Sequence, residues 1–140
     1  MRLPVLAAIL VLAAPAAAQE LGERTQRPES MLSSLGLAPG QDDLREAIVA
    51  AQAHPLGSIE NPVRVGGPPG ARAYIARLRC ADGSAPQVGP RADAGVGAFG
   101  SVVIAYPLAC GGTTSRIVFD IYHEEHVETR APAGFSLVPA

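Results

Sequence analysis

The spacing of hydrophobic residues divides the chain into a helical part followed by a β part. Between residues 42 and 53, apolar residues recur three or four positions apart, as they do on one face of a helix. The residues of this stripe are Leu44, Ile48 and Ala51. Acidic residues at positions 42 and 43 can cap the start, and Pro55 ends the helix because the residue before a proline is pushed out of the α region. The pattern predicts one helix, at the N-terminal side of the folded part.

Beyond residue 57 the spacing changes to alternation, which is typical of strands. The run of Gly and Pro at 66–70 predicts turns. The alternating segment Arg72–Cys80 that follows predicts a strand. Its expected buried face consists of Tyr74, Ala76, Leu78 and Cys80. Short extended pieces are expected at Val63–Val65 and Phe135–Val138.

A β-hairpin is expected between these short pieces. Ser101–Tyr106 is an apolar run, Arg116–Tyr122 alternates, and Gly111-Gly112 between them is a turn signal. Pro107 cannot donate a backbone hydrogen bond. We therefore expect the first strand of the hairpin to be bulged at Pro107 or to lie at a sheet edge.

The first 41 residues differ from this folded part. Residues 1–18 have the layout of a signal peptide, with Arg2 as the positive start, an apolar run, and Ala16-Ala17-Ala18 as a small-residue cleavage site. The segment 19–41 is predicted to be a flexible N-terminal arm. Residues 42–140 are predicted to form a single domain.

Composition narrows the class of protein. Cleavage after Ala18 leaves 122 residues, of which 52 are hydrophobic and 18 of those are alanine, so the core is thin. The mature chain has 10 Arg, no Lys and 13 acidic residues, and it lacks the basic excess of nucleic-acid binders. No apolar run outside the signal approaches the ~20 residues that span a bilayer. We expect a protein without a membrane anchor, located in the periplasm or secreted, that does not bind nucleic acid.

Cys80 and Cys110 remain after cleavage, and in an oxidising compartment an even number of cysteines usually means a disulfide. The alternatives are two buried free thiols or a redox pair, and the redox pair lacks the Cys-X-X-Cys spacing. Because both cysteines end predicted strands, the connection 81–100 has to cross back, or one strand has to bend sharply near Pro107. The expected fold is α+β, a small antiparallel or mixed β-sheet with one N-terminal helix and one disulfide.

One candidate for chemistry lies in this connection. Residues 95–100 spell G-x-G-x-x-G, the fingerprint of dinucleotide-binding proteins. That site needs a helix after the glycines, because the pyrophosphate sits on the helix N-terminus. Here a strand-like run follows. We predict a loop with Phe99 in the core, or a recognition surface, and no bound cofactor.

The second candidate is the segment Asp120–Glu128, which holds two of the three histidines. His123, His126 and Glu128 are the candidate ligands for zinc or another divalent metal. The spacing does not match H-E-x-x-H, so the interpretation we favour is a solvated acidic turn whose carboxylates pair with arginines. The candidate partners of these carboxylates are Arg64, Arg77, Arg79, Arg116 and Arg130. No catalytic triad or cysteine nucleophile is visible.

Several segments resemble an uncharacterised family of small exported (periplasmic) bacterial proteins. They are Asn61-Pro62-Val63-Arg64, Arg77-Leu78-Arg79-Cys80 with Asp82-Gly83, Tyr122-His123-Glu124-Glu125-His126-Val127-Glu128, and Pro132-Ala133-Gly134-Phe135. The family has no assigned activity. The resemblance therefore implies an exported domain and carries no catalytic residue onto this chain.

Two functions of different classes are compatible with these observations. The first is a non-catalytic periplasmic interaction or accessory module that presents the Gly-rich loop and the Arg-bearing strand at 72–80 to a partner. The alternative is a metal-dependent protein, such as a zinc-type hydrolase, that uses His123 and His126. An intermediate hypothesis is the carriage of a small ligand beneath the segment 81–100.

Overall fold

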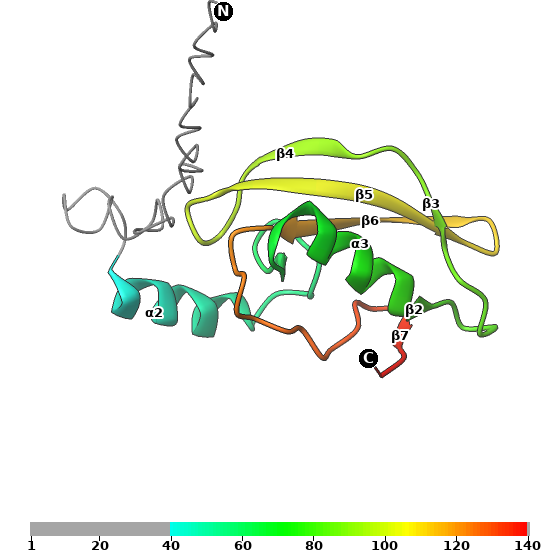
Figure 1. The fold of residues 1–140 in the computed structure, drawn as a ribbon, viewed down its shortest axis with the longest axis horizontal. Coiled ribbons are helices and arrows are strands. Elements are labelled where there is room, and N and C mark those ends of the chain that lie inside the picture. Colours follow the sequence, from blue (N-terminus) through cyan, green and yellow to red (C-terminus); the bar gives the residue numbers. More distant parts are fainter. Residues whose placement is uncertain (1–39, 140) are drawn as a thin grey trace, which may run out of the picture.

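The computed structural model describes residues 40–139, which form a mixed β-sheet, two helices and a small second sheet (Figure 1). The elements are α2 (Gln41–Ala51), β1 (Val63–Arg64), α3 (Gly67–Arg77), β2 (Leu78–Arg79), β3 (Gln87–Val88), β4 (Ala92–Val96), β5 (Val102–Cys110), β6 (Thr113–Asp120) and β7 (Ser136–Leu137). The predicted α+β class is confirmed. The expectation of one helix is wrong, because a second helix occupies most of a predicted strand.

The main sheet has the order β1-β6-β5-β3, and β4 also pairs with β5. β1 runs parallel to β6, whereas the pairs β5–β6, β3–β5 and β4–β5 are antiparallel. The predicted signal peptide and nearly all of the predicted arm lie outside the described residues. Within residues 40–139, neither helix combines the length and the apolar character needed to cross a membrane.

The predicted hairpin is confirmed and is longer than expected. β5 and β6 pair in regular register from Ile104 opposite Phe119 to Cys110 opposite Thr113. The turn has φ values of 54° at Gly111 and 87° at the next residue, Gly112. Two successive positive φ angles match the right-handed twist of the strands, and this is why two glycines connect them.

Pro107 lies within β5, an inner strand of the sheet, without a bulge in the pairing to β6, so both predicted alternatives, a bulge and an edge strand, are wrong. Its carbonyl accepts the N–H of Gly89 at 2.8 Å. In an antiparallel strand the nitrogen and oxygen of one residue face the same side. The Pro107 nitrogen therefore faces the interval between β3 and β4, where no strand pairs with β5. At this one residue β5 has the character of an edge strand.

The predicted strand Arg72–Cys80 is the second correction, because most of it is helix α3. The buried residues of α3 recur at helical rather than alternating positions, at Ala71, Tyr74 and Ile75, and the buried Leu78 follows as the C-cap. Ala76, which alternation placed inside, is exposed. The prolines at the first turn decide between the two patterns, since their fixed φ is already that of a helix.

The backbone N–H groups of residues 67–70, in the first turn of α3, are either paired or absent. Gly67 donates its N–H to the carbonyl of Ile121 at 2.7 Å, and Gly70 donates to Gly66 at 3.1 Å. Pro68 and Pro69 have no N–H to offer. The helix N-terminus therefore lacks the free amides that bind phosphate or other anions elsewhere.

Helix α2 confirms the first predicted helix. It begins at Gln41, one residue before the expected start, with Gly40 as the N-cap. The backbone N–H of Gly40 donates to the carboxylate of Asp43 at 3.0 Å. The helix ends at Ala51, four residues before Pro55.

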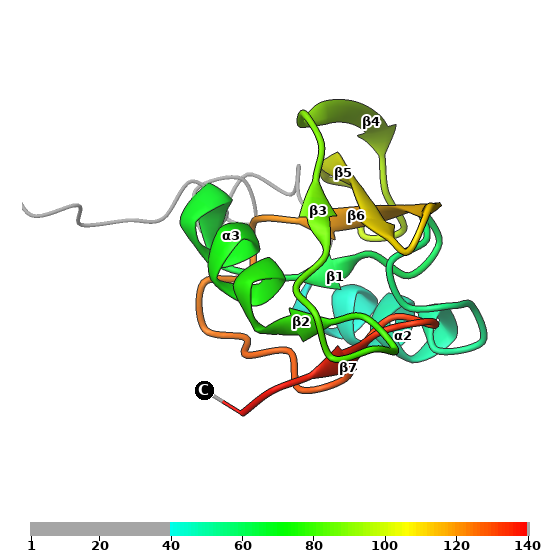
Figure 2. The ribbon, with the colours of Figure 1, turned by 90° about the vertical axis from the view of Figure 1, so that its right-hand side faces the viewer.

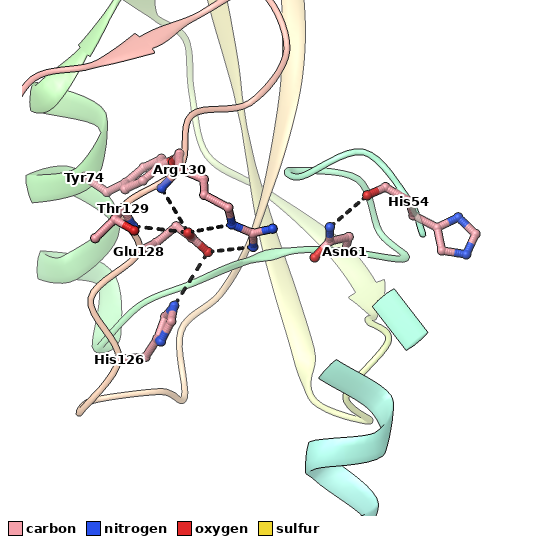
Figure 3. Close-up of polar contacts among 7 residues, drawn as sticks. All are labelled: His54, Asn61, Tyr74, His126, Glu128, Thr129 and Arg130. Carbon is pink, nitrogen blue, oxygen red and sulfur yellow. Dashed lines mark hydrogen bonds and ion pairs between the residues drawn. The ribbon is translucent and has the colours of Figure 1, made fainter. Parts of the chain in front are cut away.

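Asn61 organises the connection from α2 to β1. Its buried side-chain amide donates to the carbonyl of His54 at 2.8 Å (Figure 3). Its backbone N–H donates to the Ser58 hydroxyl at 3.1 Å, and its carbonyl accepts the N–H of Gly57 at 2.8 Å. The carbonyl of Gly57 then accepts the N–H of Val118, which attaches this connection to the sheet.

The main core lies between α3 and one face of the sheet. Figure 2 shows α3 on one side of β5, β6 and β1. Phe119 is fully buried there and meets the rings of Tyr74 and Tyr106 edge to face, with centroids 5.9 Å apart in each pair. The opposite face of the sheet carries a smaller cluster of Val103, Ala105 and Val118.

The predicted disulfide Cys80–Cys110 is present, with the two Cα atoms 5.7 Å apart. The predicted crossover or sharp bend near Pro107 is wrong. Cys80 follows β2, which pairs with β7 in a separate sheet. The connection after Cys80 contains β3 and β4, which run antiparallel to β5, so the end of β5 returns to the place where the connection begins. The strand expected near residue 136 is confirmed as β7.

Candidate functional site

The candidate metal ligands His123, His126 and Glu128 all lie in the segment 121–135, which we call the β6–β7 loop. It leaves the end of β6 and passes beside α3 to reach β7 (Figure 1). Buried carboxylates hold this loop at two places. One is Asp120, immediately before it, and the other is Glu128, within it.

Asp120 joins the start of the loop to the β4–β5 turn. Its side chain is fully buried and accepts a short hydrogen bond from the Ser101 hydroxyl, one from the backbone N–H of Tyr122 at 3.1 Å, and a contact from His123 Nε2 at 3.5 Å. Burial by itself raises the pKa of this carboxyl, but the hydrogen bonds from His123, Ser101 and Tyr122 outweigh it and lower the pKa. Phe99 packs edge to face on His123, with centroids 5.5 Å apart. An ionised Asp120 therefore fixes both segments.

Glu128 folds the second part of the loop around its carboxylate (Figure 3). Oε1 accepts the backbone N–H groups of Thr129 and Arg130, each at 3.1 Å, and Arg130 Nε at 3.0 Å. Oε2 accepts Arg130 Nη2 at 3.1 Å. Burial raises the pKa of Glu128, and the hydrogen bonds and charge of Arg130 lower it by more. The carbonyl of Arg130 accepts the Tyr74 hydroxyl at 2.7 Å, which attaches the loop to α3.

His126 lies next to Glu128 but is not hydrogen-bonded to it. Its Nε2 is 3.6 Å from Glu128 Oε2, is shielded from solvent, and has no hydrogen-bond partner among the described residues. Burial lowers the pKa of His126, the charge of Arg64 lowers it further, and the charge of Glu128 only partly opposes both. The neutral imidazole is therefore the favoured form in this loop.

The structure does not bring the three candidate ligands together. His123 contacts Asp120, whereas His126 contacts Glu128. Among residues 40–139, no three His, Cys, Asp or Glu side chains are grouped so that they could hold a metal ion. Both oxygens of Glu128 are already bonded to Arg130. Glu128 forms one of the expected ion pairs, with Arg130, but this carboxylate is buried, so the expectation of a solvated turn is wrong at this residue.

Ser101, Asp120 and His123 together have the residue types of a hydrolase triad, but not its order. In a triad the histidine stands between the serine and the carboxylate, so that it can remove the hydroxyl proton. Here the Ser101 hydroxyl donates directly to Asp120, and His123 contacts the same oxygen from another direction. The carboxylate thus contacts both side chains, and the histidine does not stand between it and the serine.

The part of the β6–β7 loop between the two carboxylates is exposed. Tyr122 is 52% exposed and Val127 is 68% exposed, and Glu124 and Glu125 are exposed between them. The backbone beneath is tightly fitted: a Cβ on Gly66 would lie 2.9 Å from the Glu124 Cα. The loop is therefore held from within while it presents an aromatic, an aliphatic and two acidic side chains outward.

The Gly-rich segment 95–100 forms the turn between β4 and β5. Gly97 donates its N–H to the carbonyl of Ser101 at 2.9 Å, which closes the turn. Strand β5 follows rather than a helix, as expected. The segment lacks the strand–turn–helix context that binds a dinucleotide.

The sequence pointed to His126 and Glu128, but it did not indicate that Ser101 and Tyr74 bond to the same loop or to the residue before it. Ser101 is 19 positions from Asp120, and no local pattern connects them. Tyr74 was assigned to a strand, so its hydroxyl could not be matched with Arg130. The signal for Tyr74 was present in the helical spacing of its buried neighbours.

No family model, no curated protein and no solved structure matches this chain. Its function is therefore argued from its own geometry.

Proposed function

We propose that this protein is an exported, non-catalytic interaction module that binds a protein partner through the exposed part of the β6–β7 loop. The surface consists of Tyr122, Glu124, Glu125 and Val127. The observation that carries the proposal is the fixation of this loop by two buried carboxylates, Asp120 before it and Glu128 within it, while these four residues between them are exposed.

A fixed loop favours binding because little conformational entropy is lost when a partner docks. Exposed loops on a rigid scaffold commonly carry recognition, and tyrosine is enriched among the residues that dominate binding energy. Two ionisable side chains of the loop, Glu128 and Arg130, are bonded to each other. The carboxylate of Glu128 in particular has both oxygens occupied.

The proposal of export is supported by two observations. Residues 1–18 have the layout of a signal peptide, and the two cysteines form a disulfide. Cell fractionation and an intact mass measurement test this proposal together. We expect the oxidised chain from Gln19 onward in the periplasm or the medium. A full-length, reduced chain in the cytoplasm would refute the export proposal.

Site-specific photo-crosslinking in the producing cells tests the binding surface. We expect a crosslinker at Tyr122 to give one discrete product, and a crosslinker at Val88, which is 51% exposed on β3, to give none. The partner identified by mass spectrometry is then purified. We expect Tyr122→Ala to weaken its binding at least tenfold and Val88→Ala to leave it unchanged. Equal effects of the two substitutions would contradict the proposed surface.

The metal-dependent alternative keeps one supporting observation, the buried Nε2 of His126 without a hydrogen-bond partner. Elemental analysis of protein purified without a histidine tag, combined with melting in EDTA, separates the two functions. Stoichiometric metal and a lower Tm in EDTA would favour the alternative. An interaction module is expected to contain no stoichiometric metal and to melt at the same temperature with and without the chelator.

A further inference from the structure

A second surface lies away from the β6–β7 loop, where α2 meets the connection before β1 and the β4–β5 turn. It is a shallow groove of about 420 Å³. The lining residues used below are Ala47, Ala50, Ala51, Ile59, Glu60 and Val96. Figure 1 shows α2 at the end of the molecule opposite β2 and β7. What this groove binds is independent of the function proposed above.

The groove exists because the residues of α2 that face it are alanines, which leave space between the helix and the turn. Its other walls carry larger apolar side chains, with Val96 63% exposed and Ile59 36% exposed. A hydrogen bond from the N–H of Ala98 to the carbonyl of Ile59, at 3.2 Å, joins these two walls. A fixed apolar hollow of this size is large enough to hold a few side chains of a ligand.

The charge around the groove differs from that of the rest of the molecule. Residues 40–60 carry four carboxylates against one arginine, whereas residues 61–139 carry seven arginines against six carboxylates. The single arginine, Arg45, is paired with Asp42 at 3.3 Å. Glu60 and His54 both line the groove. Hydrogen bonds to its own backbone and to Ser58 lower the pKa of the Glu60 carboxyl, and the charge of His54 lowers it further. A ligand that enters therefore meets apolar walls in a negative field.

We propose that this groove binds a short cationic peptide segment, whose small or medium apolar side chains fill the hollow while flanking Lys or Arg residues face Glu60 and Glu46. Charge complementarity selects this occupant: an acidic or neutral segment gains nothing from the carboxylates of α2. Glu60 lines the groove, and Glu46 is exposed outside it, one turn from Ala50 on the helix.

NMR titration with a defined probe tests the proposal. The probe is the peptide acetyl-Lys-Leu-Ala-Leu-Lys-amide, and the matched peptides carry Gln or Glu in place of Lys. We expect saturable shifts at the amides of residues 47–51, 59–60 and 96–98 with the Lys peptide. We expect binding at least fivefold weaker with the Gln peptide and none with the Glu peptide.

Matched substitutions test whether the Lys peptide binds in the groove. Glu60→Gln is expected to weaken binding of the Lys peptide at least threefold, and Glu124→Gln, the same charge change on the β6–β7 loop, to leave it unchanged. Ala50→Arg is expected to abolish binding while the amide spectrum of β5 and β6 stays that of the wild type. The proposal is overturned by unshifted groove amides, by equal binding of the three peptides, or by shifts that depend on protein concentration without peptide, which would indicate a second copy as the occupant.

Discussion

The two ends of the long β5–β6 hairpin are held by different kinds of bond. At the turn end, the Cys80–Cys110 disulfide joins β5 to β2, and β2 pairs with the C-terminal strand β7. At the other end, the ionised carboxylates of Asp120 and Glu128 hold the β6–β7 loop through hydrogen bonds. The covalent link is indifferent to pH, whereas the polar links require the charged form of their carboxylates.

Because of this difference, the disulfide affects the stability of the whole domain, whereas the carboxylates affect the conformation of the β6–β7 loop. The disulfide restricts the unfolded chain and so acts on the whole domain. The carboxylates act on one loop, since each accepts hydrogen bonds from neighbouring backbone N–H groups. A change at the turn end should therefore lower global stability and leave the loop intact, and a change at the loop end should do more to the loop than to the domain.

The largest effect is expected from removal of the disulfide. The double substitution Cys80→Ala and Cys110→Ala should lower the free energy of unfolding by about 3–4 kcal/mol, because the bond closes a loop of 30 residues. Urea unfolding at neutral pH measures the loss. The wild type in reductant is the control and should lose a similar amount. An unchanged midpoint would show that the bond adds no stability.

Glu128→Gln is expected to have the next largest effect, about 2–3 kcal/mol, since the buried amide cannot accept all four hydrogen bonds that the carboxylate accepts. Amide hydrogen exchange should show the β6–β7 loop exchanging faster than β5 and β6. Glu124→Gln is the exposed control and should change neither quantity. A uniform increase across all elements would show that Glu128 stabilises the whole domain rather than the loop.

Gly66→Ala tests the difference between the loop end and the disulfide end without any change of charge. The new Cβ would lie 2.9 Å from the backbone at Glu124, so the loop has to move while the disulfide end stays in place. We expect a loss of about 1–3 kcal/mol from this overpacking. Amide shifts should change at residues 121–127 and not at the β2–β7 pair. Gly83→Ala is unsuitable as a control because of its positive φ of 82°.

The smallest effect is expected from mild acidification. The pKa of His126 is lowered in the folded state, so the folded protein binds this proton less readily than the unfolded chain does. Stability should therefore decrease as the pH falls from above the ordinary histidine value of about 6.5. His126→Gln should remove this first decrease. Rising stability between pH 7.5 and 5.5 in the wild type would contradict the assignment.

At lower pH the two carboxylates add a second decrease of the same sign. The pKa values of Asp120 and Glu128 are both lowered on folding, so their stabilisation is present at neutral pH and is lost as the pH falls through the folded-state values. In Glu128→Gln the decrease should be smaller, with Asp120 still contributing.

The parts of the fold that sequence predicted are those governed by neighbouring residues. The turn at Gly111-Gly112 needs two positive φ angles, and glycine supplies both, so the hairpin was predictable. The helix α3 was not, because Tyr74, Ala76, Leu78 and Cys80 fit the alternation of a strand, and Gly and Pro residues before them also fit turns. The prolines at the first turn and the burial of Ile75 distinguish the two patterns.

The contacts of the candidate site also divide into those between chain neighbours, which were predictable, and those that depend on strand pairing, which were not. His126 and Glu128 lie close together because they are two positions apart in the chain, and the sequence prediction named both residues. The partner of Asp120 is Ser101, which reaches it only after β5 and β6 have paired. The side of the hairpin on which such contacts form depends on the register of the sheet, and no local spacing specifies it.

The interrupted outer edge of the sheet has a consequence for aggregation. β5 is bordered not by one long strand but by the two short strands β3 and β4, with Pro107 at the interval between them. β4 itself is irregular, with a register shift between Asp93 and Val96. Short, bulged edges with a charged residue are poor templates for a strand from another molecule. The apolar run of β5, which would be hazardous at a regular edge, is thereby shielded from self-association.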